Sequence, residues 1–248
     1  MTPPTDTDTD DLDTAEPGDD PGGRRHGPFG RATWPRALVL AAALAFLAGA
    51  VVWSVTDGDD DPFNEADVGF MQDMIHHHNQ AIQMSKILLF KADIDRDLRA
   101  FAEEFLADQR FEQGIFNALL ARFGHPVTNP DETAMGWMGP AVPMDEMAGM
   151  ATEDQMAELR AAEGADAESL FIALMAEHHL GGLHMSDTVV REGGDEALRN
   201  IAYGMLENQR DEVLDLVRAR SRLELPIPHG FTDPADDQRL RPLSLNPD

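Results

Sequence analysis

The chain has 248 residues, with 19 Lys and Arg against 46 Asp and Glu, a formal net charge of −27, and no cysteine. A surface this acidic repels phosphate, which argues against a nucleic-acid-binding protein, since these need a basic face to release counterions. The lack of cysteine excludes disulfide scaffolds, thiolate zinc sites, iron–sulfur clusters and cysteine nucleophiles. The 9 His and 13 Met residues are therefore the first candidates for functional side chains.

The N-terminal region divides into a polar tail and an apolar run. Residues 1–36 are rich in Thr, Asp, Pro and Gly, and are predicted to be a disordered tail. Residues 37–55 carry no charge, and as a helix they would extend roughly 28 Å, about the thickness of a bilayer core. The sequence therefore predicts a transmembrane anchor over residues 37–56.

The charges on either side of the apolar run predict its orientation. Arginines precede it and aspartates follow it, so the positive-inside rule places the N-terminus in the cytoplasm. Everything after Asp57 is then extracytoplasmic on a single-pass protein of the cell membrane. The alternative is a cleaved signal peptide, because Ala48-Gly49-Ala50 resembles a cleavage site.

Beyond the apolar run, hydrophobic residues recur at helical spacing and the domain is predicted to be all-α. The expected helices are 63–91, 95–123, 152–163, 166–192 and 195–223. Gly124 and the Gly193-Gly194 pair are the expected stops, and Thr152 to Gln155 has the form of a capping box. The Met-rich linker 125–151 and the C-terminal tail 224–248 are expected to be irregular.

The region after residue 62 contains an internal repeat. A shift of 101 residues aligns Phe70, Met74, His77, His78, Ile82, Met84 and Ser85 with Phe171, Met175, His178, His179, Leu183, Met185 and Ser186. A shift of 100 aligns Leu98, Arg99, Ala102, Leu106, Gln109, Arg110 and Glu112 with Leu198, Arg199, Ala202, Leu206, Gln209, Arg210 and Glu212. Each unit is a helix hairpin, and two hairpins predict a four-helix bundle over residues 62–223.

Helical spacing places histidines and carboxylates on the inward faces of this bundle. The first and third long helices carry paired histidines near the apolar stripe, while Glu112 and Glu212 interrupt apolar seams on the second and fourth. A carboxylate in a seam is costly unless it is paired, hydrogen-bonded or bound to metal. The candidate metal ligands are His77, His78, His178, His179, Met74, Met84, Met175, Met185, Glu112 and Glu212. The alternative is a metal-free polar layer that fixes helix register.

The two histidine motifs also carry a family resemblance. Residues 74–84 and 175–185 resemble the doubled M-x-x-H-H-x-x-A-x-x-M motif of the domain of unknown function 305 family, and the segment 149–162 resembles its lead-in. This ferritin-like bundle family includes CopM-type copper-binding proteins of the bacterial envelope. The resemblance covers residues 62–222 and implies a ferritin-like four-helix bundle that binds copper.

The chain departs from the family pattern at several positions. Phe116 and Leu216 stand where the family often has Met four residues after the Glu of the second and fourth helices. Leu180 replaces a common acidic residue, and Gly182 replaces the usual Ala. These changes weaken the soft-metal ligand set, for which His184 is a candidate substitute.

The available ligands favour copper or silver. Thioether and imidazole without thiolate suit Cu(I) or Ag(I), while imidazole and carboxylate suit Cu(II). The linker region adds Met-x-x-Met-like spacing that could capture Cu(I) from a mobile loop, or could be hydrophobic filler; these residues are Met135, Met138, Met144, Met147, Met150 and Met156. The expected function is copper binding, buffering or delivery, aided by an acidic surface that attracts cations.

Two other functions remain open at this point. A di-iron or dimanganese oxidoreductase needs Glu-x-x-His on two core helices, and the core helices here lack that motif. A metal-free, membrane-anchored interaction bundle with an unknown protein partner is the second alternative. The sequence shows no hydrolase or transferase constellation, so no enzyme activity is predicted.

Overall fold

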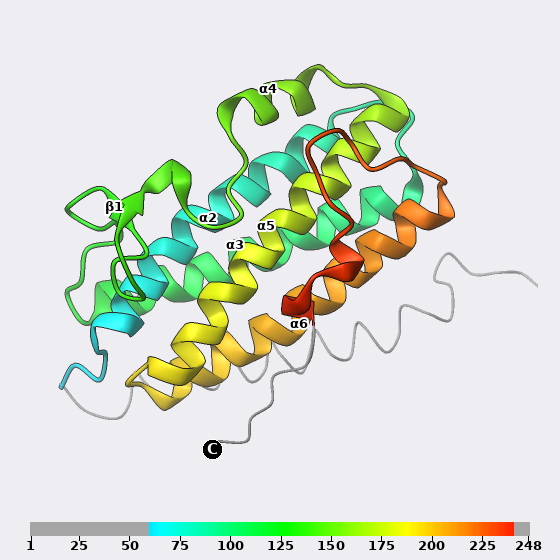
Figure 1. Cartoon of the computed structure of the whole chain (residues 1–248). Coiled ribbons are helices and arrows are strands. Elements are labelled where there is room, and N and C mark those ends of the chain that lie inside the picture. The colour runs from blue at the N-terminus through cyan, green and yellow to red at the C-terminus, as the bar shows by residue number, and fades with distance from the viewer. Residues whose placement is uncertain (1–59, 241–248) are drawn as a thin grey trace, which may run out of the picture. The chain divides into compact units, whose positions relative to one another are not determined.

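A computed structural model describes residues 60–240, which form a helical bundle (Figure 1). Its helices are α2 (Glu65–Leu89), α3 (Arg96–Arg122), α4 (Glu153–Ala161), α5 (Gly164–Glu192) and α6 (Glu196–Arg222). The five expected helices are present, and their ends differ from the expected ones by at most two residues. The all-α prediction is therefore confirmed.

The predicted tail 1–36, the predicted anchor 37–56 and residues 241–248 lie outside the described residues. Between residues 60 and 240, no helix combines the length and the apolar character needed to cross a bilayer.

Local chemistry explains where the helices begin and end. Asn64 caps α2, and its side chain and that of Asp67 form a reciprocal capping box. The capping box predicted for α4, between Thr152 and Gln155, is also present. After α3 the chain turns at Gly124, whose φ of 76° lies in the left-handed region that glycine adopts without strain.

The bundle consists of two hairpins that meet through their first helices. α2 packs along α3, α5 packs along α6, and α2 and α5 pack against each other, whereas α3 and α6 touch little. The buried apolar side chains form two main clusters, one containing Met84 and Met175 and the other containing Met74 and Met185. This arrangement agrees with the repeat, because each hairpin supplies equivalent residues to both clusters.

A pair of equivalent carboxylates ties the hairpins together. Asp67 on α2 accepts hydrogen bonds from the backbone N–H groups of Gly194 at 2.9 Å and Asp195 at 3.0 Å, at the start of α6. Glu168 on α5 accepts one from the N–H of Asp95 at 2.6 Å, at the start of α3. Each hairpin thus supplies an acceptor for the N–H of the residue that caps the second helix of the other, Asp95 or Asp195.

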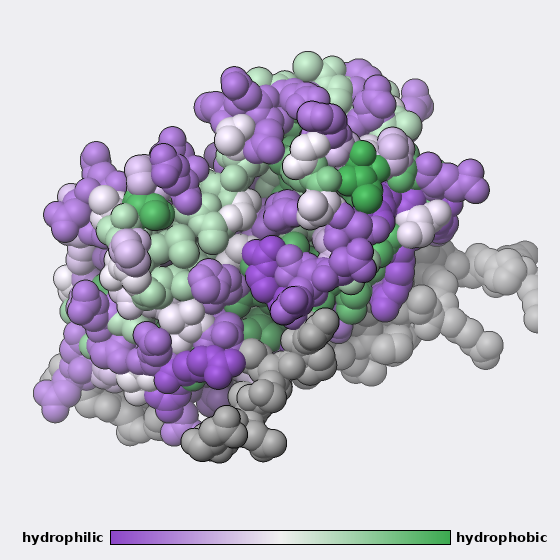
Figure 2. All heavy atoms as spheres, in the orientation of Figure 1, coloured by the Kyte–Doolittle hydropathy of each residue, from purple (hydrophilic) through white to green (hydrophobic). Residues whose placement is uncertain are grey.

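The linker between the hairpins is mostly irregular, with two short antiparallel strands, β1 (Thr133–Ala134) and β2 (Val142–Pro143), and a 3₁₀ turn at Met144–Glu146. Its methionines contribute to the core. Met147 is buried in one apolar cluster and Met156 of α4 in the other, while Met135, Met138, Met144 and Met150 are partly buried against the first of these clusters. The surface in this area is pale and weakly hydrophobic, with hydrophilic residues around it (Figure 2). These contacts favour hydrophobic filler, the second of the two alternatives for these methionines, over a mobile, metal-capturing loop.

The segment after α6 is held against the bundle. It contains 3₁₀ turns at Pro234–Asp236 and Gln238–Leu240. Phe231 and Leu240 pack against an apolar cluster, and Arg220 of α6 forms an ion pair with Asp233 at 2.6 Å. The described part of the tail is therefore irregular in its backbone but attached by specific contacts.

Candidate functional site

The four candidate histidines lie in one buried layer across the bundle. His77 and His78 come from α2, His178 and His179 come from α5, and none is more than 1% exposed. The imidazoles of His77 and His178 stack with their centroids 3.7 Å apart and their planes at 29°. The contact between α2 and α5 therefore brings together the two motifs that the repeat relates.

The outer histidine of each pair contacts the seam glutamate of the next helix. His78 Nε2 lies 2.7 Å from Glu112 Oε2, and His179 Nε2 lies 2.9 Å from Glu212 Oε2. The predicted meeting of imidazoles with carboxylates is therefore present in both hairpins. These contacts offset part of the desolvation of two carboxylates that are almost fully buried.

The inner histidines use backbone acceptors instead. His77 Nε2–H donates to the carbonyl of Ala148 in the linker at 3.1 Å, and His178 Nε2–H donates to the carbonyl of His77 at 2.9 Å. A carbonyl oxygen only accepts, so the proton of each neutral ring is on Nε2. Burial holds the pKa of both rings well below the usual range of histidine, and nearby imidazoles lower it further.

All four imidazoles leave the same atom without a partner. Nδ1 of His77, His78, His178 and His179 is buried and has no hydrogen-bond partner among the described residues. An unsatisfied buried acceptor costs roughly 1–3 kcal/mol. Histidines that bind metals commonly donate one ring N–H to a carbonyl or carboxylate and bind the ion through the other nitrogen. The layer reproduces the first half of that arrangement at His77, His78 and His178, whereas His179 Nε2 lies near Glu212 without forming a hydrogen bond.

The candidate methionines lie on both sides of this layer. Met74 and Met185 share one apolar cluster, Met84 and Met175 share the other, and each is completely buried. Each cluster therefore combines the Met before the histidines of one repeat with the Met after those of the other. The structure does not gather the four thioethers at a single point.

The described residues do not form a closed coordination sphere. Between residues 60 and 240, no three His, Asp or Glu side chains are grouped so as to hold a metal ion. His184, the candidate substitute ligand, is exposed, so it does not take part in the buried layer. The donor types present still fit copper, since imidazole and thioether are ligands that this metal accepts.

Sequence reasoning missed a third carboxylate at the site. Asp108 on α3 lies near Glu112 and Glu212, and its pKa is raised to about 7, first by burial and then by Glu212, Glu112 and Glu104. The equivalent residue in the second repeat is Asn208, whose amide donates to Glu212 at 3.3 Å. The repeat alignment could have identified this position, because Asp108 directly precedes Gln109.

The linker passes close to the histidine layer because two glycines leave room for it. A Cβ at Gly181 of α5 would lie 2.1 Å from the carbonyl oxygen of Ala148. A Cβ at Gly149, which has a φ of 82°, would lie 2.6 Å from the carbonyl oxygen of Glu177. Gly182 has a related role, since a Cβ there would lie 2.3 Å from Gln209 Oε1. Ala148 reaches His77 because of these close approaches.

Comparison with known proteins identifies the chain's relatives. The family model of DUF305, described as a domain of unknown function, matches residues 67–220. A DUF305 protein from Streptomyces coelicolor is 32% identical, with 66% of this chain and 96% of that chain covered and a TM-score of 0.60. A DUF305 fragment from Deinococcus radiodurans is 26% identical, with 65% and 99% covered and a TM-score of 0.56.

A third solved structure shares the fold. CopM in its Cu(II)-bound form is 21% identical, with 63% of this chain and 97% of that chain covered and a TM-score of 0.52. A search of curated proteins gives no match. The family-model match spans more than half of the chain and agrees with the repeated histidine motifs, so the chain belongs to the DUF305 family.

Proposed function

We propose that this protein binds copper at the histidine layer, with Nδ1 of the imidazoles as the ligand atoms. The observation that carries the proposal is the set of four buried Nδ1 atoms without partners, which occur at equivalent positions in both repeats. Buried polar atoms are nearly always satisfied in folded proteins, so four equivalent exceptions in one layer call for an explanation. A bound metal ion would satisfy them.

The protonation state of the layer supports this proposal. A metal ion binds neutral imidazole, and binding weakens when a proton must first be displaced. Burial lowers the pKa of His77 and His178, so both rings are neutral at physiological pH. Their free lone pairs are therefore available without release of a proton.

The groups that contact Nε2 of the imidazoles are proposed to orient the rings and not to bind the metal. Glu112 and the carbonyl of Ala148 accept hydrogen bonds from Nε2–H and so fix the orientation and tautomer of their imidazoles, and Glu212 lies 2.9 Å from Nε2 of His179. We therefore propose the two glutamates as orienting groups, whereas the sequence suggested them as ligands. This use of the carboxylates also favours copper binding over a di-iron oxidoreductase, whose carboxylates bind the metals directly.

Copper is the metal that the donor set favours. The same helices carry the four candidate thioethers, which are buried and select soft ions such as Cu(I), and the chain has no thiolate. Two imidazoles and one thioether would form a site that needs no third His, Asp or Glu. CopM, which shares the fold, is described in a Cu(II)-bound form. The proposed role is binding, buffering or delivery of copper, without catalysis.

We further propose that the domain is held at the outer face of the cell membrane by residues 37–56. The charge asymmetry around that segment supports this orientation. The strongly acidic surface would then raise the local concentration of cations around the bundle.

Metal binding by the full-length chain tests the proposal. Samples with Cu(I) under reductant, Cu(II) or Fe(II) are desalted and their metal content is measured by elemental analysis, and Cu(I) affinity is measured by competition with a chelator. The informative variant is His77→Gln with His178→Gln. A glutamine amide can replace the Nε2–H donor but not the Nδ1 lone pair. We expect copper affinity to fall at least tenfold with the fold retained.

The matched control is His76→Gln, which changes the half-exposed neighbour of the pair. This variant should bind copper as the wild type does. Absence of copper binding by the wild type would refute the proposal and favour the metal-free bundle. Uptake of Fe(II) with consumption of O₂ would favour the oxidoreductase. Unchanged affinity of the double variant would show that Nδ1 of His77 and of His178 is not a ligand.

A further inference from the structure

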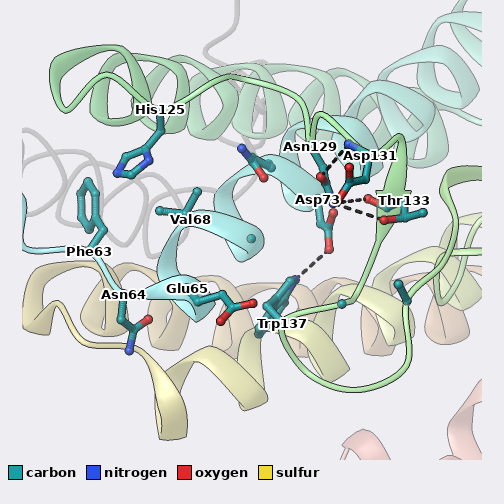
Figure 3. Close-up of a pocket in the computed structure, with 14 residues that line it drawn as sticks. Phe63, Asn64, Glu65, Val68, Asp73, His125, Asn129, Asp131, Thr133 and Trp137 are labelled. Carbon is teal, nitrogen blue, oxygen red and sulfur yellow. Dashed lines mark hydrogen bonds between the residues drawn. The ribbon is translucent and has the colours of Figure 1, made fainter.

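A second site lies between the start of α2 and the linker. It is a cavity of about 500 Å³, and none of the ten candidate metal ligands lines it. Figure 3 shows its walls, which include Phe63, Glu65, Asp73, His125, Asp131 and Trp137. A cavity of this size is within the range of small-molecule sites, which are typically about 300–1,000 Å³.

One wall of the cavity is aromatic and fixed in place. The indole of Trp137 lies against α2 at Gly69, where a Cβ would approach it to 2.3 Å. Its Nε1–H donates to Asp73 Oδ2 at 2.8 Å, which fixes the orientation of the ring. Trp137 remains partly exposed, so the ring is accessible from the cavity.

The charged groups that line the cavity are all negative. Glu65, Asp73 and Asp131 contribute carboxylates, and the lining contains no Lys or Arg. Within residues 60–240, neither Glu65 nor Asp131 forms an ion pair, and Figure 3 shows the Glu65 side chain reaching toward Trp137. His125, the remaining ionisable group of the lining, is engaged by Asp61 at 2.7 Å.

Asp73 offers the cavity one free carboxylate oxygen on an otherwise anchored side chain. Its side chain is only 2% exposed, yet it lines the cavity. Both of its hydrogen bonds, from the N–H of Met135 at 2.7 Å and from Trp137, fall on Oδ2. Oδ1 therefore has no protein donor among the described residues. An oxygen that faces the cavity without a protein donor is free to accept a charge-assisted hydrogen bond from a cationic ligand.

We propose that this cavity binds a small organic cation, such as a protonated amine. Carboxylates without counterions attract positive charge, and the face of an indole ring attracts a cation within about 6 Å of its centre. A metal ion fits the site less well, because the described residues include no group of three His, Asp or Glu side chains suited to hold one. The ligand would be bound by the Glu65 and Asp131 carboxylates, Asp73 Oδ1 and the Trp137 ring.

Calorimetric titration of the full-length chain with 1,4-diaminobutane, in moderate salt and without copper, tests the proposal. We expect saturable binding of one diamine per chain. Glu65→Gln and Asp131→Asn should each weaken binding at least fivefold, and the double variant more strongly. The matched control is Glu103→Gln, which removes the same charge from an exposed position on α3 and should leave the affinity unchanged.

Three results would overturn the proposal. The first is the absence of saturable binding. The second is equal weakening by the control and the cavity variants, which would indicate only a general attraction to an acidic surface. The third is equally tight binding of neutral 1,4-butanediol or displacement of the diamine by one equivalent of Ca²⁺. The site is independent of the proposed copper function, because His77→Gln with His178→Gln should bind the diamine as the wild type does.

Discussion

The two hairpins bring equivalent residues together in the outer contact, with a hydrogen bond only at His78, and they differ in the inner contact. In each hairpin the second histidine of the pair meets the glutamate of the next helix, at 2.7 Å and 2.9 Å. The first histidines differ, since His77 donates to the linker at Ala148 and His178 donates to the backbone of His77. The repeat thus determines the outer contacts, while the single linker makes the inner contacts asymmetric.

Equivalent positions on α2 and α5 show how the linker breaks the symmetry. Gln80 on α2 forms two side-chain hydrogen bonds with the backbone of Ala151, at 2.8 Å and 2.7 Å. The residue aligned with it on α5 is Gly181, which instead allows Ala148 to come into backbone contact. The first repeat therefore holds the linker through hydrogen bonds from a side chain. The second repeat packs against the linker backbone, because glycine has no side chain at that position.

The largest loss of stability is expected from a substitution that displaces the linker from α5. Gly181→Ala places a methyl group where the Ala148 carbonyl lies, so the linker must move and His77 loses its acceptor. We expect a loss of about 3 kcal/mol in the free energy of unfolding. The control is Gly114→Ala on α3, where no atom lies near the new Cβ, and it should stabilise by roughly 0.5–1 kcal/mol. Denaturant unfolding measures both, and equal effects would contradict the close approach.

A smaller loss of stability is expected when either outer contact between histidine and glutamate is removed. Glu112→Ala leaves the Nε2–H of His78 without an acceptor and should cost about 2 kcal/mol. Glu212→Ala should cost only about 1 kcal/mol, because burial raises the pKa of Glu212 and its charge already destabilises the fold. Unfolding of both variants at neutral pH measures the difference. A larger loss for Glu212→Ala would refute this ranking.

The smallest effect concerns Asp108 and depends on pH. Its pKa in the fold, about 7, is above its unfolded value, so the native state holds a proton that the unfolded chain has released. The stability from this group therefore falls as the pH rises from about 4 to 7. Asp108→Asn, which copies Asn208, should stabilise by on the order of 1 kcal/mol at pH 8, after allowance for solvent screening, and by less at pH 5.

The reverse substitution sharpens this comparison. Asn208→Asp replaces a donor to Glu212 by a negative charge, so it should destabilise the fold at pH 8 and have less effect at pH 5. Thermal unfolding of both variants at the two pH values tests the pair. A stabilisation by Asp108→Asn that is equal at both pH values would show that the carboxylate is not perturbed.

Side-chain patterns predicted much of the bundle. Helical periodicity fixes which residues share a face, so the stripe that includes His78 and the seam that includes Glu112 could be recognised before any coordinates. The repeat then predicted the same arrangement in the second hairpin, because His179 aligns with His78 and Glu212 aligns with Glu112. The same logic placed the helix ends, which depend on local capping groups such as Thr152.

The parts that escaped prediction depend on backbone atoms and on helix crossing. The acceptor of His77 is the carbonyl of Ala148, and a carbonyl carries no side-chain signal in a sequence. The pairing of Met74 with Met185, and of Met84 with Met175, follows from the antiparallel contact of α2 with α5, which spacing within one helix cannot show. Asp108 was missed because its pKa is raised first by burial and then by Glu212 of α6, and neither is visible from spacing on α3 alone.

The reciprocal hydrogen bonds that Asp67 and Glu168 accept from the other hairpin also bear on how the chain folds. These hydrogen bonds join residues 127 and 73 positions apart, whereas the hairpins themselves consist of neighbouring helices. Local contacts form quickly and distant ones slowly, because a long loop must close first. A hairpin that forms early has its own N-cap, Asp95 or Asp195, but lacks this additional acceptor until the other hairpin arrives. Docking of the two hairpins is therefore the step that forms these hydrogen bonds in both. The pair of hairpins is then the cooperative folding unit.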